Sequence, residues 1–230
     1  MIQEQELYIF MGPPGSGKGT LSQLCIDKLG WKQISTGNLC RKHIAEQTEI
    51  GKAIDFAIKS GKLVSDDLIT QMVIDWFENT YSQSKPVILD GYPRTEIQAR
   101  VFDKFLREKL MHLQVTLVFF DINDEEVVKR LSARAVCSNK ECQAVYSLLP
   151  QSKMASKEYG ICDLCGSVVV RRSDDHPDSI RVRLATYAHH AKMLDSYYDN
   201  SGQKVVHLDA QQPLDKLYRN FMEVIGRTVE

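Results

Sequence analysis

The stretch GPPGSGKGT occupies residues 12–20 and decides the fold of this 230-residue chain. The apolar run LYIFM at 7–11 precedes it and predicts a buried strand, and residues 21–29 predict a helix. Glycines between a strand and a helix let the backbone turn tightly, so that its N–H groups and the helix N-terminus face an anion. The spacing Gly-x₄-Gly-Lys in this setting therefore predicts a phosphate-binding loop.

One position departs from the usual form of such a loop. The residue after Lys18 is Gly19, where a serine or threonine hydroxyl normally ligates Mg²⁺. Mg²⁺ must then be held mainly by phosphates, water and another acidic group, for which Asp90, at the end of a predicted strand, is the candidate. Thr20 is one place further on and better placed for a more internal phosphate.

Apolar runs bounded by turn residues alternate with longer segments of helical periodicity, which indicates an α/β fold with a parallel sheet. The predicted strands are 7–11, 33–34, 86–90, 114–120 and 204–208. The predicted helices are 17–29, 38–46, 51–60, 65–79, 96–108, 124–134, 178–200 and 214–228. Between about 136 and 172 this alternation stops, and short β-like pieces predict an inserted β lobe.

Charge and hydropathy exclude several classes of protein. The formal net charge is −1, so no general field attracts nucleic acid or an anionic membrane. Apolar runs such as VTLVFF at 115–120 are too short to span a bilayer, and the acidic N-terminus is unlike a signal peptide. We expect a cytoplasmic protein, and a monomer because no unusual apolar stripe calls for a partner.

Four of the six cysteines form two close pairs within the predicted lobe. Cys137 and Cys142 are separated by four residues, and Cys162 and Cys165 by two. Two close cysteine pairs within one short segment are typical of a structural Cys₄ zinc site. Disulfides are the alternative, which the reducing cytoplasm disfavours. We therefore expect structural Zn²⁺ on Cys137, Cys142, Cys162 and Cys165.

Further motifs follow the loop in a fixed order. They are ISTGNLCR at 34–41, GKLVSDDL at 61–68, LDGYPRTEIQA at 89–99, EEVVKRLSAR at 125–134, the four cysteines, and VRRSDDHPDSIRVRLATY at 170–187. With them, essentially the whole chain resembles the long-lid, zinc-containing form of adenylate kinase. The resemblance implies a P-loop NTPase-like five-stranded parallel sheet flanked by helices. It also implies reversible, Mg²⁺-dependent transfer of the ATP γ-phosphoryl group to AMP, which gives two ADP.

The resemblance also assigns residues, and the assignments suit a reaction that needs positioning and fixed positive charge. Catalytic roles fall to Lys18, Arg94, Arg134, Arg172, Arg183 and Asp90. ATP would be bound by Gly15, Ser16, Gly17, Lys18, Gly19, Thr20, Arg130, Arg134 and Gln212. AMP would be bound by Thr36, Arg41, Lys62, Leu63, Val64, Gly91, Tyr92, Pro93, Arg94, Gln98, Arg172 and Arg183.

The same resemblance divides the chain into three parts. Residues 1–34, 65–134 and 173–230 would form the core with the phosphate loop, 35–64 an AMP-binding insertion, and 135–172 a zinc-binding lid. Three residues depart from the family pattern: Asn38 replaces an aspartate, Ser65 a proline, and Ala135 a second arginine. The sequence does not decide whether the Tyr92–Pro93 peptide is cis.

Two other functions remain open from the sequence. One is a nucleoside monophosphate kinase that prefers an acceptor with another base, such as CMP or UMP. Thr36 and Gln98 argue against it. The other is a nucleotide-switched protein whose Cys₄ lobe binds nucleic acid, although Tyr146 and Tyr159 alone are a poor stacking set.

Overall fold

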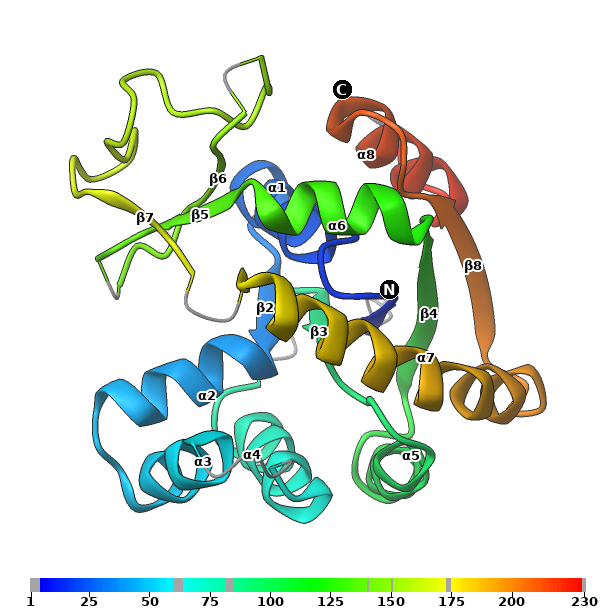
Figure 1. Ribbon diagram of the computed structural model, residues 1–230. Coiled ribbons are helices and arrows are strands. Elements are labelled where there is room, and N and C mark those ends of the chain that lie inside the picture. Colours follow the sequence, from blue (N-terminus) through cyan, green and yellow to red (C-terminus); the bar gives the residue numbers. More distant parts are fainter. Residues whose placement is uncertain are drawn as a thin grey trace. The chain divides into compact units, whose positions relative to one another are not determined.

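The structure is a computed structural model that describes residues 5–59, 64–81, 85–139, 141–149, 151–172 and 175–228. The chain forms two compact units, which are described separately (Figure 1). The first comprises Met1–Gly12, Gly17–Asp121 and His189–Glu230. The second comprises Pro13–Ser16 and Ile122–Ala188.

The first unit is built on a five-stranded sheet. In spatial order its strands are β2 (Lys32–Ser35), β3 (Val87–Asp90), β1 (Gln5–Met11), β4 (Leu113–Asp121) and β8 (Lys204–Asp209). Every neighbouring pair is parallel. The predicted five-stranded parallel sheet is therefore confirmed, with ends shifted by one or two residues.

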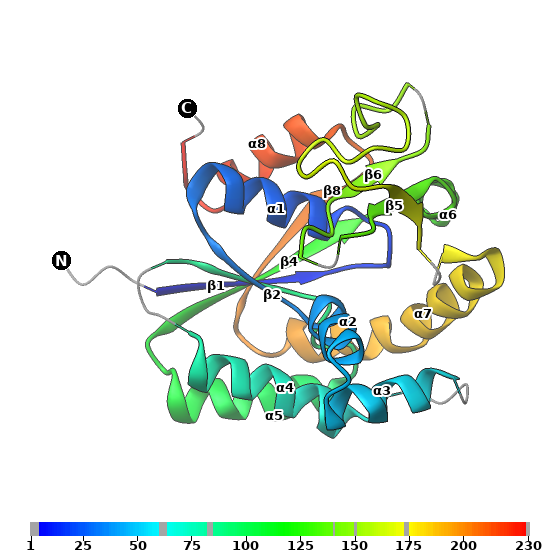
Figure 2. The same cartoon turned by 90° about the vertical axis from the view of Figure 1, so that its left-hand side faces the viewer.

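The central strand β1 is buried on both faces, as expected of a parallel sheet. Leu7 and Ile9 belong to the cluster formed with α4 (Asp66–Asn79) and α5 (Glu96–Lys109). Phe10 instead meets Phe221 of α8 (Leu214–Val224) edge to face, and α8 contacts α1 (Lys18–Leu29). Figure 2 shows these two helix pairs on opposite sides of the sheet.

Local capping explains where several helices begin. The Ser35 side chain accepts a hydrogen bond from the Asn38 N–H, so α2 (Thr36–Ala45) begins two residues before the predicted start. The Ser65 and Thr95 hydroxyls cap α4 and α5 in the same way. A third helix, α3 (Glu49–Lys59), follows α2 and packs against it. Helix α7 (Pro177–Asp199) begins in the second unit and ends in the first.

The second unit contains α6 (Asp124–Ser132), capped by the Asn123 side chain, and a small antiparallel sheet in the order β6–β5–β7. The strands are β5 (Arg134–Cys137), β6 (Val145–Ser147) and β7 (Val169–Arg171). The helix predicted to reach Arg134 is thus too long, because α6 ends at Ser132 and Arg134 already pairs in β5. The predicted β lobe is confirmed.

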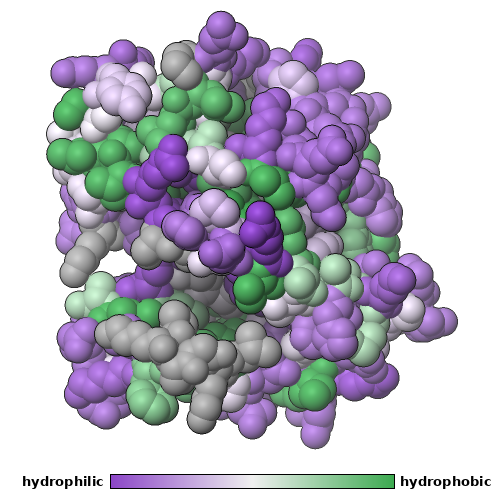
Figure 3. Space-filling model, viewed as in Figure 1, coloured by the Kyte–Doolittle hydropathy of each residue, from purple (hydrophilic) through white to green (hydrophobic). Residues whose placement is uncertain are grey.

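Apolar side chains stay exposed on the small sheet, where Val145 and Val170 are 38% and 43% exposed. Apolar surface is visible over this part of the chain in Figure 3. Beneath it, Ala135, Tyr146 and Val169 pack with two of the cysteines into a core of their own. Among the described residues, no helix combines the length and apolar character that crossing a membrane requires.

Candidate active site and metal centre

The loop between β1 and α1 has the backbone geometry that its glycines predict. Gly15 has φ +84°, and a Cβ there would lie 2.7 Å from the Leu131 Cγ, so a larger residue would be both strained and crowded. Lys18 begins α1, and its Nζ donates to the Gly12 carbonyl at 2.8 Å. The helix N-terminus and a lysine ammonium therefore lie at the end of β1, an arrangement suited to phosphate.

Asp90 lies beside the unusual glycine of this loop. It is the last residue of β3, and its Oδ2 is 3.6 Å from the place where a Cβ on Gly19 would stand. The carboxylate is therefore next to the position at which other phosphate loops carry a hydroxyl. Asp90 and Gly19 are therefore close to each other in space. The role of Asp90 toward a metal remains a prediction.

Thr36 and Arg94 converge on Gly91, just beyond β3. The Gly91 carbonyl accepts hydrogen bonds from the Thr36 hydroxyl and from Arg94 Nε, both at 2.8 Å. Gly91 has φ +80°, and a Cβ there would lie 2.9 Å from the Thr36 hydroxyl oxygen, so only glycine fits. A buried hydroxyl and an exposed guanidinium group thus share one anchor.

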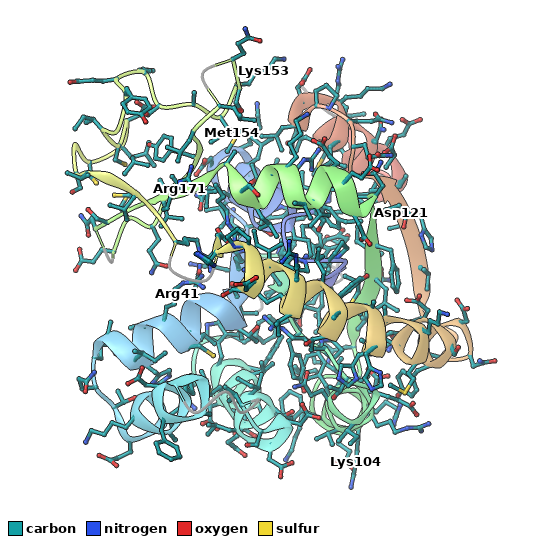
Figure 4. All side chains as sticks on the ribbon, in the orientation of Figure 1. Arg41, Lys104, Asp121, Lys153, Met154 and Arg171 are labelled. Atoms are coloured by element: carbon teal, nitrogen blue, oxygen red, sulfur yellow. The ribbon has the colours of Figure 1, made fainter. Side chains whose placement is uncertain are left out.

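Arg41 projects from α2 (Figure 4), and Asn38 of the same helix accepts a hydrogen bond from its guanidinium group. The neutral side chain of Asn38 therefore contacts Arg41 without adding a charge. Burial raises the pKa of the nearby Cys40 thiol, while the positive charges of Arg94 and Arg41 oppose that rise. Both guanidinium groups thus lie near enough to the Cys40 thiol to affect its pKa.

Gln98 is buried, with 3% of its surface exposed, and both ends of its amide are engaged. Its Oε1 accepts from the Arg94 backbone N–H at 2.7 Å, and its Nε2 donates to Asp66 Oδ1 at 2.7 Å. The Thr95 hydroxyl donates to the other oxygen of Asp66 at 2.8 Å. The structure therefore brings Gln98 together with Arg94 and adds Asp66, which the sequence did not single out.

The remaining residues predicted to bind AMP are partly described. The Tyr92–Pro93 peptide is cis, and the buried Tyr92 hydroxyl is 3.0 Å from the Thr70 hydroxyl oxygen. Val64 is half-buried just before the cap of α4. The predictions for Lys62 and Leu63 lie outside the described residues.

In the second unit, two of the predicted arginines share one carboxylate. Asp175 Oδ2 and Oδ1 accept from Arg134 Nε and Nη2, each at 2.6 Å, and Oδ1 also accepts from Arg183 Nη1 at 3.0 Å. The Asp175 side chain is only 3% exposed, so the interaction is poorly screened by water. A buried carboxylate therefore fixes Arg134 in a bidentate geometry and draws Arg183 to the same place.

Other predicted ligands of ATP and AMP have local partners. Arg130 donates to Glu126 one turn earlier on α6, at 3.0 Å. Gln212 donates to Asp209 at 2.9 Å and accepts from Asn220 at 3.2 Å, which ties the turn after β8 to α8. Arg172 follows β7 and is half-buried. Their roles toward nucleotides stay predictions.

The four cysteines of the second unit form a compact cluster. Their Sγ atoms all lie within 4.8 Å of one another, with short contacts of 3.4 Å for Cys137 to Cys165 and 3.7 Å for Cys142 to Cys162. Sulfurs bound at about 2.3 Å to one tetrahedral ion stand about 3.8 Å apart. Each close pair thus contributes one sulfur to each short contact, and the four donors fit a single tetrahedral ion.

Local contacts prepare these thiols unequally for a metal. Hydrogen bonds from Ser167 lower the pKa of Cys165 to about 6, whereas burial raises the pKa of Cys137 to about 12. The Tyr146 hydroxyl is 3.3 Å from the Cys162 sulfur and also accepts the Asp163 N–H, which anchors the second pair. A metal ion would favour the thiolate form of every ligand.

Two acidic residues, one in each unit, contact predicted site residues but escaped prediction from the sequence. Asp66 accepts a hydrogen bond from Gln98, and Asp175 accepts hydrogen bonds from Arg134 and Arg183. Each belongs to a pair of adjacent acids, Asp66 with Asp67 and Asp174 with Asp175. Such pairs were the available signal, but nothing in the sequence says which member faces inward.

Comparison with known proteins agrees with this geometry. The adenylate kinase family model matches residues 10–203. The chain is 35% identical to an adenylate kinase of Fervidobacterium nodosum over 95% of this chain and 96% of that protein. For an adenylate kinase of Thermosipho africanus the figures are 34%, 95% and 99%, and for one of Borreliella burgdorferi they are 34%, 94% and 97%. The chain therefore belongs to the adenylate kinase family.

Proposed function

We propose that the chain transfers the γ-phosphoryl group of ATP to AMP, giving two molecules of ADP, and that it also catalyses the reverse reaction. The observation that carries this proposal is the sharing of the Gly91 carbonyl by Thr36 and Arg94, beside the buried amide of Gln98. A hydroxyl, a guanidinium group and an amide suit a nucleoside monophosphate better than a water molecule or a protein side chain as acceptor.

The chemistry requires no covalent intermediate with the protein. An oxygen of the AMP phosphate forms a bond to the γ-phosphorus as the bond to the β,γ-bridging oxygen breaks, and the leaving group is ADP. Charge spreads over the transferred oxygens, so the protein contributes mainly position and positive charge. Lys18 and the N-terminus of α1 suit the ATP phosphates, and Arg41 and Arg94 suit the phosphate of AMP.

Mg²⁺, when bound with ATP, neutralises charge on the β- and γ-phosphates. The donor set suits it, because the Asp90 carboxylate beside Gly19 is an oxygen ligand of the kind that Mg²⁺ prefers, directly or through water. In the second unit, Arg134, Arg172 and Arg183 would supply further charge to the transferred group. Arg130 and Gln212 would complete the ATP site.

An acceptor panel tests the proposed reaction. ADP formation from ATP is measured with AMP, CMP, UMP and IMP in turn, with and without Mg²⁺. We expect AMP to be preferred by at least about tenfold in kcat/KM, because a hydrogen-bonding site rejects bases that leave its groups unpaired. Omission of Mg²⁺ should abolish turnover. Preference for a pyrimidine would favour the alternative kinase, and salt-sensitive RNA binding without turnover would favour the nucleic-acid-binding protein.

We also propose that the Cys₄ cluster holds a structural Zn²⁺ and that residues 135–172 form a lid stabilised by it. Four sulfurs leave no open position on a tetrahedral ion, so the ion would hold the lobe together and take no part in the reaction. The core insertion at 35–64 would bind AMP. The monomeric state, the absence of nucleic-acid and membrane partners, and the cytoplasmic location are proposed from the sequence.

Loss of one sulfur ligand should release the metal. We expect Cys142→Ser to lower bound zinc from about one equivalent to a small fraction, measured by mass spectrometry of the metal, because a structural site needs its full ligand set. Limited proteolysis should then cut within 135–172. Cys40→Ser, which lies outside the cluster, is the matched control and should retain zinc. The zinc assignment would be contradicted by a wild-type protein that contains no zinc and that resists proteolysis no better than Cys142→Ser does.

A further inference from the structure

The side chain of Gln98 is held from two sides by groups of opposite hydrogen-bonding character. Asp66 Oδ1 lies 2.7 Å from Nε2, and the Arg94 backbone N–H lies 2.7 Å from Oε1. An ionised carboxylate only accepts, and a backbone N–H only donates. Both neighbours therefore require the same orientation of the amide, and a flipped amide would lose two hydrogen bonds and gain two repulsive contacts.

Asp66 is itself held in place. The Thr95 hydroxyl donates to Asp66 Oδ2 at 2.8 Å and accepts the Gln98 backbone N–H at 3.2 Å. The cap of α5 and the first turn of α4 are thus joined through one carboxylate. The Tyr92 hydroxyl donates to the Gln98 backbone carbonyl at 3.2 Å, so it belongs to the same hydrogen-bonded network.

A fixed amide distinguishes purine bases. Gln98 has one N–H and one lone pair left after these contacts, and their positions are set by the orientation. Adenine offers a donor at its 6-amino group and an acceptor at N1, whereas a 6-oxopurine offers an acceptor at O6 and a donor at N1. For a base held in one orientation, an amide that could rotate would pair with both kinds of purine, but a fixed amide pairs with only one.

We propose that Asp66 is a positioning residue that sets the acceptor base. By holding Nε2 of Gln98, it makes the site complementary to adenine and repulsive to 6-oxopurines such as hypoxanthine. The inference rests on the proposed function, since it assumes that the base of AMP contacts Gln98. Asp66 does not contact the nucleotide and acts only through the amide of Gln98.

The test compares AMP with IMP as acceptors for the wild-type chain and two variants. In Asp66→Ala the amide loses its acceptor, and we expect the ratio of kcat/KM for AMP to that for IMP to fall at least about tenfold. The KM for ATP should stay unchanged. In Asp66→Asn the side-chain oxygen can still accept from Gln98 while its amide group faces the Thr95 hydroxyl, so the ratio should stay within about threefold of wild type.

A matched control separates positioning from helix stability. Asp67→Ala removes the other acid from the first turn of α4, where both carboxylates favour the helix, but Asp67 is exposed. Its acceptor ratio should change by less than about twofold. If Asp66→Ala does not fold, Asp66→Ser supplies the same measurement, because serine suits a helix start and its hydroxyl is too short to replace the carboxylate.

The outcomes are distinguishable. An unchanged acceptor ratio in Asp66→Ala, or equal losses in Asp66→Ala and Asp66→Asn, would overturn the positioning role while leaving the proposed reaction intact. A wild-type chain that does not phosphorylate AMP would instead reject the proposed function, and with it the inference that depends on it.

Discussion

Replacement of Lys18 by alanine is expected to lower kcat by at least about 10³-fold, equivalent to about 4 kcal/mol of transition-state stabilisation. The Nζ of Lys18 lies 2.8 Å from the Gly12 carbonyl at the start of the phosphate loop, and the residue opens α1. Because Gly19 provides no hydroxyl for a metal, we expect the lysine charge to contribute more to stabilising the phosphates in the transition state. The measurement is steady-state ADP production with saturating ATP and AMP.

The fold should survive this change, because Lys18 is half-buried and each hydrogen bond of the kind it makes to the Gly12 carbonyl contributes only about 1 kcal/mol. Lys28→Ala is the matched control. It lies on the same helix, is exposed, and stands 5.7 Å from the centre of the Tyr218 ring. Its turnover should remain within about twofold of wild type. A folded Lys18→Ala protein with nearly normal turnover is the result that would exclude the assigned phosphate loop.

The sheet could be predicted from the sequence because its strands are short apolar runs that end at turn residues. Leu7, Ile9 and Met11 alternate with Tyr8 and Phe10, and all five are buried. Such a pattern is local, so it is visible without knowledge of neighbours. The ends of elements depend on caps that the apolar pattern does not show: Ser35 caps α2, which therefore begins earlier than its apolar pattern indicates.

The β lobe shows where local patterns fail. Arg134 continues the helical charge pattern of α6, yet it is the first residue of β5, where it pairs with Ser147. That pairing and the ion pair with Asp175 are tertiary contacts, which outweigh a weak local preference for helix. The cysteines, by contrast, were predictable as a cluster because their chemistry demands a common ligand.

The two acids that contact predicted site residues could not be found from the sequence. Asp175 lies 41 residues after Arg134, and Asp66 lies 32 residues before Gln98. Both are close to their partners only because the fold brings the segments together. The family resemblance predicted the arginines and the glutamine as site residues. The carboxylates that bind them were found only from the hydrogen bonds of the structure.

The second large effect is expected from Asp175→Asn. The change leaves the shape of the side chain but replaces one acceptor oxygen with a donor that faces guanidinium N–H groups. Because Asp175 is 3% exposed, loss of its charge should lower the free energy of unfolding by about 3 kcal/mol. Turnover should fall by about 10²-fold or more, since Arg134 and Arg183 lose the group that places them together.

Asp178→Asn is the matched control for this change. It also pairs with an arginine, Arg181, at 3.2 Å, but the two side chains are 79% and 78% exposed. Such a surface pair contributes at most about 1 kcal/mol, so both thermal unfolding and turnover should stay close to wild type. If Asp175→Asn lowers stability and leaves kcat unchanged, Asp175 only stabilises the second unit. If kcat falls with AMP and ATP saturating, the shared carboxylate also sets the positions of the arginines for phosphoryl transfer.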